Sequence, residues 1–432
     1  MISWNTCSRY KTMSAYKIQK VSRDGIGYSI AELNDVRHVF AAAVPQSGTT
    51  FREQAESAME VIREVNSFQG TANEIVNQAV FLADSSLLEE CRRFMREFYG
   101  PSLPAISYIL QPSCEGKLLA VESLGMGGKE QDLTVSRINE HVVMVRHNGI
   151  AWVHAAIAPE TRCIRTAYEQ ASHGFSLLRS VLADAGIRMD RILRTWLYQG
   201  GIVADEGDSQ RYKELNRART DAYQDVDFLA GLLPRGYSSD RAYPASTGIG
   251  TDGSGFAISA IALSTERSDI RTVPLENPVQ TPAFKYPGHY SPNSPQFSRA
   301  MAVSCGNMAT IFISGTASVT ASEARHIGDA EAQTRQTLDN IAALIGEENL
   351  SRHGLPGLGT TLDGLGYVRV YIKRQEDFAR IRAVCQERLG ELPAIYAIAD
   401  VCRPEWLVEI EGIAISRKEA APKPTVTDFK NQ

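Results

Sequence analysis

The sequence predicts an α+β fold built from three tandem copies of one unit. The string LPAI occurs at Leu103–Ile106 and again at Leu392–Ile395, and a related string, YPAS, occupies Tyr243–Ser246. The prolines of these strings, at positions 104, 244 and 393, are 140 and 149 residues apart, which is an ordinary size for one domain. Around each string the same order of predicted elements appears: strand, helix, strand, helix, strand.

The first strand and the first helix of each unit follow from hydrophobic periodicity. Apolar runs predict strands over residues 36–44, 150–158 and 309–319. Each run is followed by a segment with apolar residues at i, i+3, i+4 and i+7, which is typical of a helix with one buried face. These helices are expected over residues 51–65, 164–186 and 329–346.

The second half of each unit repeats this pattern. Alternation of apolar and polar residues predicts strands that turn one face toward the helices. These middle strands are expected over residues 77–84, 192–200 and 366–374. Second helices then follow at 86–99, 209–224 and 376–390, and closing strands at 117–124, 255–263 and 406–415.

The repeat divides the chain into an N-terminal extension (1–35), three units (36–130, 138–267 and 285–417) and a flexible tail (418–432). Two helices cover only one face of each sheet, so the other face needs a partner. Three units can cover one another's open faces around a pseudo-threefold axis. We therefore expect a monomeric, single-chain pseudotrimer.

Composition excludes several classes of protein. The 432 residues carry a formal net charge of −5, which provides no positive field for nucleic acid or an anionic membrane. No apolar run reaches the ~18–20 residues of a spanning helix, and the start MISWNTCSRYKT lacks the apolar core of a signal peptide. We therefore expect a cytoplasmic protein. The seven cysteines and eight histidines are scattered, which predicts free thiols and no metal site.

Motifs of the third unit carry a family resemblance. The strings ISGTASV, DAEAQTRQTLDNIAALI, YVRVYIKRQEDF and LVEIEGIAI resemble the RidA/YjgF family of chorismate-mutase-like α+β domains, which form trimers with active sites between subunits. Deaminases of this family have an arginine after a Pro-Ala pair that binds the substrate carboxylate. Ile106, Ser246 and Ile395 occupy that position here, which disfavours an imine deaminase.

Four further strings are similar to the chorismatase branch of this superfamily, whose members are sometimes called pteridine-dependent dioxygenase-like. They are PQFSRAM (295–301), ISGTAS (313–318), PASTGIG (244–250) and ADVCRPEWLVEIEG (399–412). The resemblance implies cleavage of chorismate to pyruvate and either 3-hydroxybenzoate or a dihydroxycyclohexadiene carboxylate, without a cofactor. Members of this branch are usually shorter, so we interpret the first unit as an addition.

Glu409 is the strongest candidate for a catalytic residue. Alternation in WLVEIEG directs Leu407, Glu409 and Glu411 to one face of the sheet, away from the helices. The aligned positions in the other units are Ala120 and Ala257, so the acid is present in one copy. The resemblance implies general acid/base work for Glu409 in a cleft between units two and three, where poor solvation would raise its pKa.

Other candidates are basic or aromatic residues that could bind a dicarboxylate such as chorismate, because guanidinium groups bind carboxylates through paired hydrogen bonds. Arg382 is placed on the second helix of unit three and is expected to share the cleft with Glu409. The further candidates for substrate binding are Arg369, Tyr396, Arg299, Arg219 and Tyr212.

Cys402 and Gly315 are assigned to product selection. The resemblance associates a cysteine and a glycine at these positions with the branch that yields 3-hydroxybenzoate; a small residue would leave room for the ring hydroxyl. Two other readings stay open: an imine deaminase or hydrolase, and a non-catalytic binding or scaffold protein. Release of pyruvate from chorismate discriminates among the three.

Overall fold

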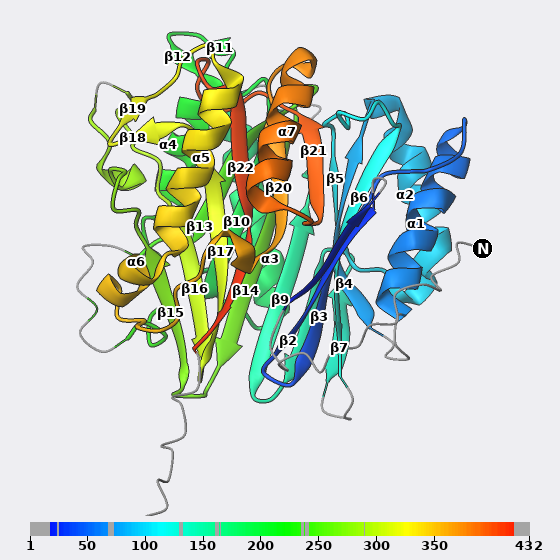
Figure 1. Cartoon of the computed structure of the whole chain (residues 1–432), viewed down its shortest axis with the longest axis horizontal. Coiled ribbons are helices and arrows are strands. Elements are labelled where there is room, and N and C mark those ends of the chain that lie inside the picture. The colour runs from blue at the N-terminus through cyan, green and yellow to red at the C-terminus, as the bar shows by residue number, and fades with distance from the viewer. Residues whose placement is uncertain are drawn as a thin grey trace, which may run out of the picture.

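The computed structural model describes residues 18–23, 26–67, 73–128, 133–159, 164, 166–234, 237, 242–288 and 290–418. Its main elements are three six-stranded sheets, each with helices on its outer face (Figure 1). In all three sheets the strands, taken in chain order, lie in the order first, second, third, sixth, fourth, fifth. The repeat that the sequence predicts is therefore visible as one topology formed three times.

The first sheet has the order β1-β2-β3-β6-β4-β5 and is covered by α1 and α2. The elements are β1 (Gln19–Arg23), β2 (Ile26–Leu33), β3 (Val36–Ala43), α1 (Phe51–Ser67), β4 (Glu74–Leu82), α2 (Leu88–Tyr99), β5 (Ala105–Ile109) and β6 (Leu119–Gly127).

The second sheet has the order β7-β8-β9-β14-β10-β13, with α3 and α4 outside it. Its elements are β7 (Thr134–Asn139), β8 (Val142–His147), β9 (Ile150–Ile157), α3 (Ala167–Asp184), β10 (Ile192–Gly200), α4 (Arg211–Tyr223), β13 (Ala245–Thr251) and β14 (Phe256–Thr265). A small hairpin, β11 (Asp205–Glu206) and β12 (Ser209–Gln210), precedes α4.

The third sheet has the order β15-β16-β17-β22-β20-β21. Its elements are β15 (Ile270–Leu275), β16 (Ala300–Cys305), β17 (Met308–Thr316), α5 (Ala330–Ile345), α6 (Glu347–Arg352), β20 (Leu365–Ile372), α7 (Phe378–Leu389), β21 (Ala394–Ile398) and β22 (Val408–Arg417). A second small hairpin is formed by β18 (Val319–Thr320) and β19 (Glu323–Ala324).

Helix starts and strand interiors follow local chemistry. The side chain of Thr166 accepts a hydrogen bond from the backbone of Glu169 at the start of α3, and Asp329 does the same for Ala332 at the start of α5. Such caps satisfy amide groups that have no partner within the helix. The middle strands β10 and β20 are buried along their whole length, because helices cover one face and the neighbouring sheets cover the other.

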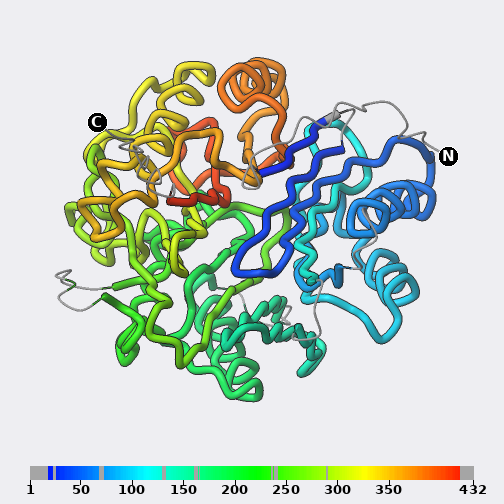
Figure 2. The backbone as a smooth tube through the Cα atoms, turned by 60° about the horizontal axis from the view of Figure 1, so that its bottom comes forward, coloured from blue at the N-terminus to red at the C-terminus, as the bar shows by residue number. Residues whose placement is uncertain are grey.

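The three sheets lie around a common centre with the helices at the periphery (Figure 2). Strands of different sheets meet there: β5 contacts β9, β13 contacts β17, and β2 contacts β20. The open face of each sheet is therefore buried by its neighbours, and one large apolar cluster joins residues of all three sheets. No helix in the part of the chain that the structure describes is long and apolar enough to cross a membrane.

The structure corrects the element boundaries in three places. β1 and β2 lie within the expected N-terminal extension and form one side of the first sheet. β7 begins at Thr134, before the expected start of the second unit, and β15 lies between the expected second and third units. These short strands were missed because each is stabilised by pairing with the next strand, which local periodicity does not reveal. The expected tail lies outside the described residues from position 419 onward.

Candidate active site

A cavity of about 420 Å³ lies between the second and third sheets. One wall comes from α4 and β13, and the opposite wall from the ends of β17 and β22. The segment before β16 and the loop before β22 close the remaining sides. The two walls are joined directly, since the amide of Ser246 donates to the hydroxyl of Ser314 at 2.9 Å.

Glu409 lines this cavity and is buried, with 4% of its surface exposed. It pairs with Tyr371 of the middle strand of its sheet. Ala257 and Ala120 pair with the corresponding middle-strand residues, Tyr198 and Phe81. The strand register thus agrees with the sequence alignment of the three units, and the third unit alone places a carboxyl at this position.

The surroundings of Glu409 favour its protonated form. Burial raises its pKa to about 8, and the negative charge of Glu411 acts in the same direction. Arg194 and Arg299 act in the opposite direction but do not cancel the cost of burial. A carboxyl group in this state is protonated at neutral pH, and it can serve as a general acid.

Two buried arginines lie beside the ring of Phe297 at the wall of the cavity. Arg219 on α4 and Arg299 before β16 lie 5.6 and 5.5 Å from its ring centroid, and each is about 2–3% exposed. The Nε atoms of both guanidinium groups are buried and lack a hydrogen-bond partner in the structure. Groups of this kind can bind a carboxylate in paired geometry.

Arg219 also lies beside the strand position at which an arginine is expected in the RidA-like deaminases and is absent from this chain. Its Nη1 atom lies 3.4 Å from the hydroxyl of Ser246, which occupies the position where the RidA-like deaminases are expected to have their arginine. The helix therefore supplies a cation beside the place where the strand lacks one. The loss of an arginine from the strand does not leave this cleft without positive charge.

Arg403, which directly follows Cys402, is a third arginine at the cavity and was not among the residues expected from the sequence. Its guanidinium lies 4.1 Å from the ring centroid of Tyr290, 4.8 Å from that of Trp406 and 5.1 Å from that of Tyr286. It also donates to the carbonyl of Ser322 at 3.1 Å. Three aromatic rings thus hold this cation at the wall of the cavity.

Cys402 and Tyr212 lie together on the cavity wall. Burial raises the pKa of the Cys402 thiol to about 12, and the charge of Glu409 adds to the effect. Burial also raises the pKa of Tyr212. Both groups are therefore neutral near neutral pH, and they can act as hydrogen-bond partners but not as a thiolate or a phenolate.

Gly315 lies against the carboxyl group of Glu409. A Cβ atom at this position would lie 2.8 Å from Cδ of Glu409, nearer still to its Oε1, and 3.0 Å from Cγ2 of Thr247. The space beside Gly315 is thus filled by the acid itself. This gives the glycine a second role, because a larger residue would displace Glu409.

Three of the expected substrate-binding residues lie elsewhere. Tyr396 on β21 interacts with Arg382 on α7 and with Glu115 of the first unit, and neither Tyr396 nor Arg382 lines the cavity. The reason is that the cleft is closed by the helix and edge strand of the preceding unit, α4 and β13. The shared cleft expected for Arg382 and Glu409 is therefore not formed.

Arg369 is the third expected substrate-binding residue that does not line the cavity. It is buried at the centre of the molecule, where its Nε donates to Glu122 of the first sheet at 2.7 Å. It also forms an ion pair with Glu411 at 3.1 Å. Its two acidic partners keep it out of the cavity and give it a structural role.

No group of three or more His, Cys, Asp and Glu residues in the described ranges could hold a metal ion. The described cysteines, Cys91, Cys114, Cys305, Cys385 and Cys402, are free thiols.

Comparison with known proteins agrees with the resemblance. Residues 130–262 match the family described as chorismatase FkbO/Hyg5-like, N-terminal, and residues 291–416 match the endoribonuclease L-PSP family. A 3-hydroxybenzoate synthase of Streptomyces hygroscopicus is 34% identical over 52% of this chain and 63% of its own length. A chorismatase of Streptomyces rapamycinicus is 36% identical over 51% of this chain and 63% of its own length. The matches thus span just under two thirds of these relatives.

A crystal structure of a chorismatase matches 87% of this chain and 98% of its own, with a TM-score of 0.60 and 22% identity. At this identity the similarity establishes the fold. The second and third sheets together make up about two thirds of the chain, so the match extends into the first sheet. A RutC family protein of Pyrococcus horikoshii is 32% identical over 27% of this chain and 84% of its own length. On these matches, the chain belongs to the RutC family and is similar to chorismatases.

Proposed function

We propose that this protein cleaves chorismate to pyruvate and 3-hydroxybenzoate, with Glu409 as the general acid. The observation that carries the proposal is a buried carboxyl group, with its pKa raised to about 8, in a cavity that three arginines line. Relatives named chorismatase and 3-hydroxybenzoate synthase support the same reaction.

The cavity suits a small dianion. Chorismate carries two carboxylates, and Arg219, Arg299 and Arg403 are available to bind them. The unpartnered Nε atoms of Arg219 and Arg299 would gain hydrogen bonds on binding. Because Glu409 is neutral at neutral pH, it would not repel the substrate.

The reaction begins with protonation of the methylene carbon of the enol ether by the carboxyl group of Glu409. In the hydrolytic route, water adds to the pyruvyl carbon of the resulting cation, and the bond between this carbon and the ether oxygen then breaks, which leaves that oxygen on the ring. In the internal route, the ring hydroxyl attacks the adjacent ring carbon, the bond between this carbon and the ether oxygen breaks as pyruvate leaves, and loss of a ring proton restores the aromatic ring. Attack by water consumes one water molecule and gives the dihydroxycyclohexadiene acid. The internal route gives 3-hydroxybenzoate and pyruvate, whose atoms together equal those of chorismate, so no oxidant is required. The carboxylate of Glu409 recovers a proton at the end of the cycle.

We assign product selection to Cys402 and Gly315. The Cys402 thiol is neutral and can donate or accept a weak hydrogen bond during rearomatisation of the ring. Gly315 acts through the placement of Glu409, because the acid occupies the space beside it. Glu409, held in one position, would then serve both the protonation of the enol ether and the later proton transfers.

We further propose that the chain is a single-chain pseudotrimer of three RidA-like units with one active cleft. The three sheets share one strand order and meet at a common centre. The positions equivalent to Glu409 in the other two units are alanines, which supports one acid per chain. We propose unit boundaries near residues 18–128, 133–265 and 270–417, adjusted to the observed strands.

The proposal is tested by incubating the purified protein with chorismate, measuring pyruvate with a coupled assay and separating the second product by chromatography. We expect pyruvate and 3-hydroxybenzoate in equal amounts. The diol as sole second product would overturn the branch but not chorismate cleavage. Absence of pyruvate would overturn the function, and ammonia release from a small imine would then favour the deaminase reading.

A further inference from the structure

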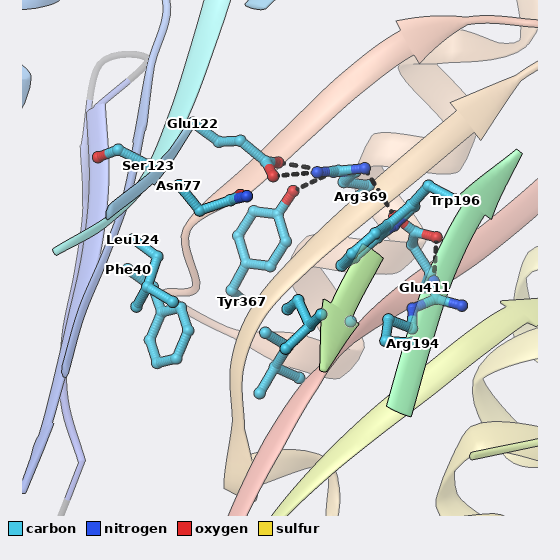
Figure 3. A pocket seen from close by; sticks show the side chains of 13 residues that line it. Phe40, Asn77, Glu122, Ser123, Leu124, Arg194, Trp196, Tyr367, Arg369 and Glu411 are labelled. Carbon is cyan, nitrogen blue, oxygen red and sulfur yellow. Dashed lines mark hydrogen bonds and ion pairs between the residues drawn. The ribbon is translucent and has the colours of Figure 1, made fainter. Parts of the chain in front are cut away.

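A network of buried charged and aromatic side chains occupies the centre of the molecule (Figure 3), and its residues are distinct from those that line the cavity with Glu409. Glu411 accepts hydrogen bonds from several members of this network and is 2% exposed. Its Oε1 accepts from Trp196 at 2.7 Å and from Tyr371 at 3.1 Å, and its Oε2 pairs with Arg194 at 2.6 Å. The carboxylate is thus fixed by donors from two sheets.

A second carboxylate, Glu122, occupies the equivalent position of the first sheet. It pairs with Ala79 as Glu411 pairs with Arg369 in the strand register. Glu122 is bound by Arg369 in the same network (Figure 3). It does not line the cavity that contains Glu409. Glu411 and Glu122 therefore belong to the same buried network, but they differ in how they are connected to the cavity that contains Glu409.

Thr247 connects Glu411 to the cleft. Its hydroxyl donates to Oε2 of Glu411 and accepts from Arg194 at 2.5 Å and from the backbone amide of Gly315 at 2.9 Å. The hydroxyl's one donor and both acceptor positions are therefore used. Gly315 in turn lies against the carboxyl group of Glu409.

We propose that Glu411 and Thr247 are positioning residues of the active site: Glu411 favours the protonated form of Glu409, and Thr247 holds the Gly315 strand against it. This inference rests on the proposed function of Glu409 as the acid. Glu409 and Glu411 are two residues apart on β22 and face the same side, so their side chains are about 7 Å apart. At that distance a buried negative charge measurably disfavours ionisation of a neighbouring carboxyl.

Other groups also face Glu409 and must be considered in any pH dependence. Burial and the charge of Glu411 raise its pKa, while Arg194 and Arg299 lower it. Cys402 and Tyr212 interact with it as well, but burial keeps both neutral near pH 8. Glu411 is therefore the group whose removal shifts the equilibrium toward ionised Glu409 without altering the cavity wall.

The first test is the pH profile of kcat for pyruvate release from chorismate by Glu411→Gln. Loss of a negative charge lowers the pKa of Glu409, so the alkaline limb should move to lower pH, by about one pH unit. The matched control is Glu122→Gln, the same change in the same network, whose limb should stay in place. A limb that is unmoved in folded Glu411→Gln, or moved equally in both variants, would overturn the role of Glu411.

The second test compares Thr247→Val with Thr247→Ser. Valine keeps the shape of the side chain but removes the hydroxyl, so we expect kcat to fall about tenfold or more through displacement of Glu409, with KM nearly unchanged. Serine keeps the hydroxyl and should restore most of the activity. Equal kcat values for the valine and serine variants would overturn the role of Thr247, and this comparison does not depend on the folding of Glu411→Gln. If the wild-type protein releases no pyruvate from chorismate, this result would instead refute the proposed function.

Discussion

The substitution Gly315→Ala places a methyl group where the structure has the carboxyl of Glu409. The new Cβ would lie 2.8 Å from Cδ of Glu409 and 3.0 Å from Cγ2 of Thr247. Carbon atoms in good contact are about 3.5–4.0 Å apart, so the carboxyl carbon must move by about 1 Å. The backbone at Gly315 is also held by its hydrogen bond to Thr247, so the strain falls on the acid.

A displacement of about 1 Å of a catalytic group costs about 10²-fold in rate. We therefore expect Gly315→Ala to lower kcat for pyruvate release by about two orders of magnitude, with a smaller change in KM. The assay is the initial rate of pyruvate formation over a range of chorismate concentrations, with circular dichroism to confirm folding.

Gly288→Ala is the matched control, because a Cβ at this exposed position would contact nothing within 4 Å. It should retain the rate of the wild type. A folded Gly315→Ala protein with an unchanged kcat would refute the argument that the glycine exists to seat Glu409, and the space beside it would then serve the substrate ring.

Further predictions address the remaining assignments. Glu409→Gln should lower kcat by ~10²–10⁴-fold. Wild-type kcat should fall as the pH rises through about 8, because only the protonated carboxyl of Glu409 donates and its pKa is about 8. Initial rates of both proteins, measured through the alkaline range, check these two predictions. Arg299→Ala should raise KM for chorismate, whereas Arg382→Ala should leave it unchanged, because only Arg299 lines the cavity. Arg369→Ala should lower the free energy of unfolding in urea by ~3–5 kcal/mol, since it leaves the buried Glu122 carboxylate without its partner. Cys402→Ala should increase the share of the diol on chromatography if the thiol assists rearomatisation.

The sequence alone was sufficient for features that depend on local order. The repeated strings located three units, and helical periodicity placed α1, α3 and α5 close to their observed bounds. Alternation along β22 directed Glu409 away from the helices, and alignment of the repeats showed that only one copy has an acid there. Residues near one another in the chain decide these features, since they follow from the period of a helix or a strand.

Tertiary structure alone decided which surfaces meet. The cleft joins β22 of the third unit to α4 of the second, so Arg219 lines the cavity while Arg382, on the equivalent helix of the third unit, does not. Likewise Arg369 is bound by Glu122, which lies 247 positions away in the chain, and is therefore absent from the cleft. Periodicity gives the face on which a side chain lies but not the partner that covers that face, because the partner depends on how the three units pack around their centre.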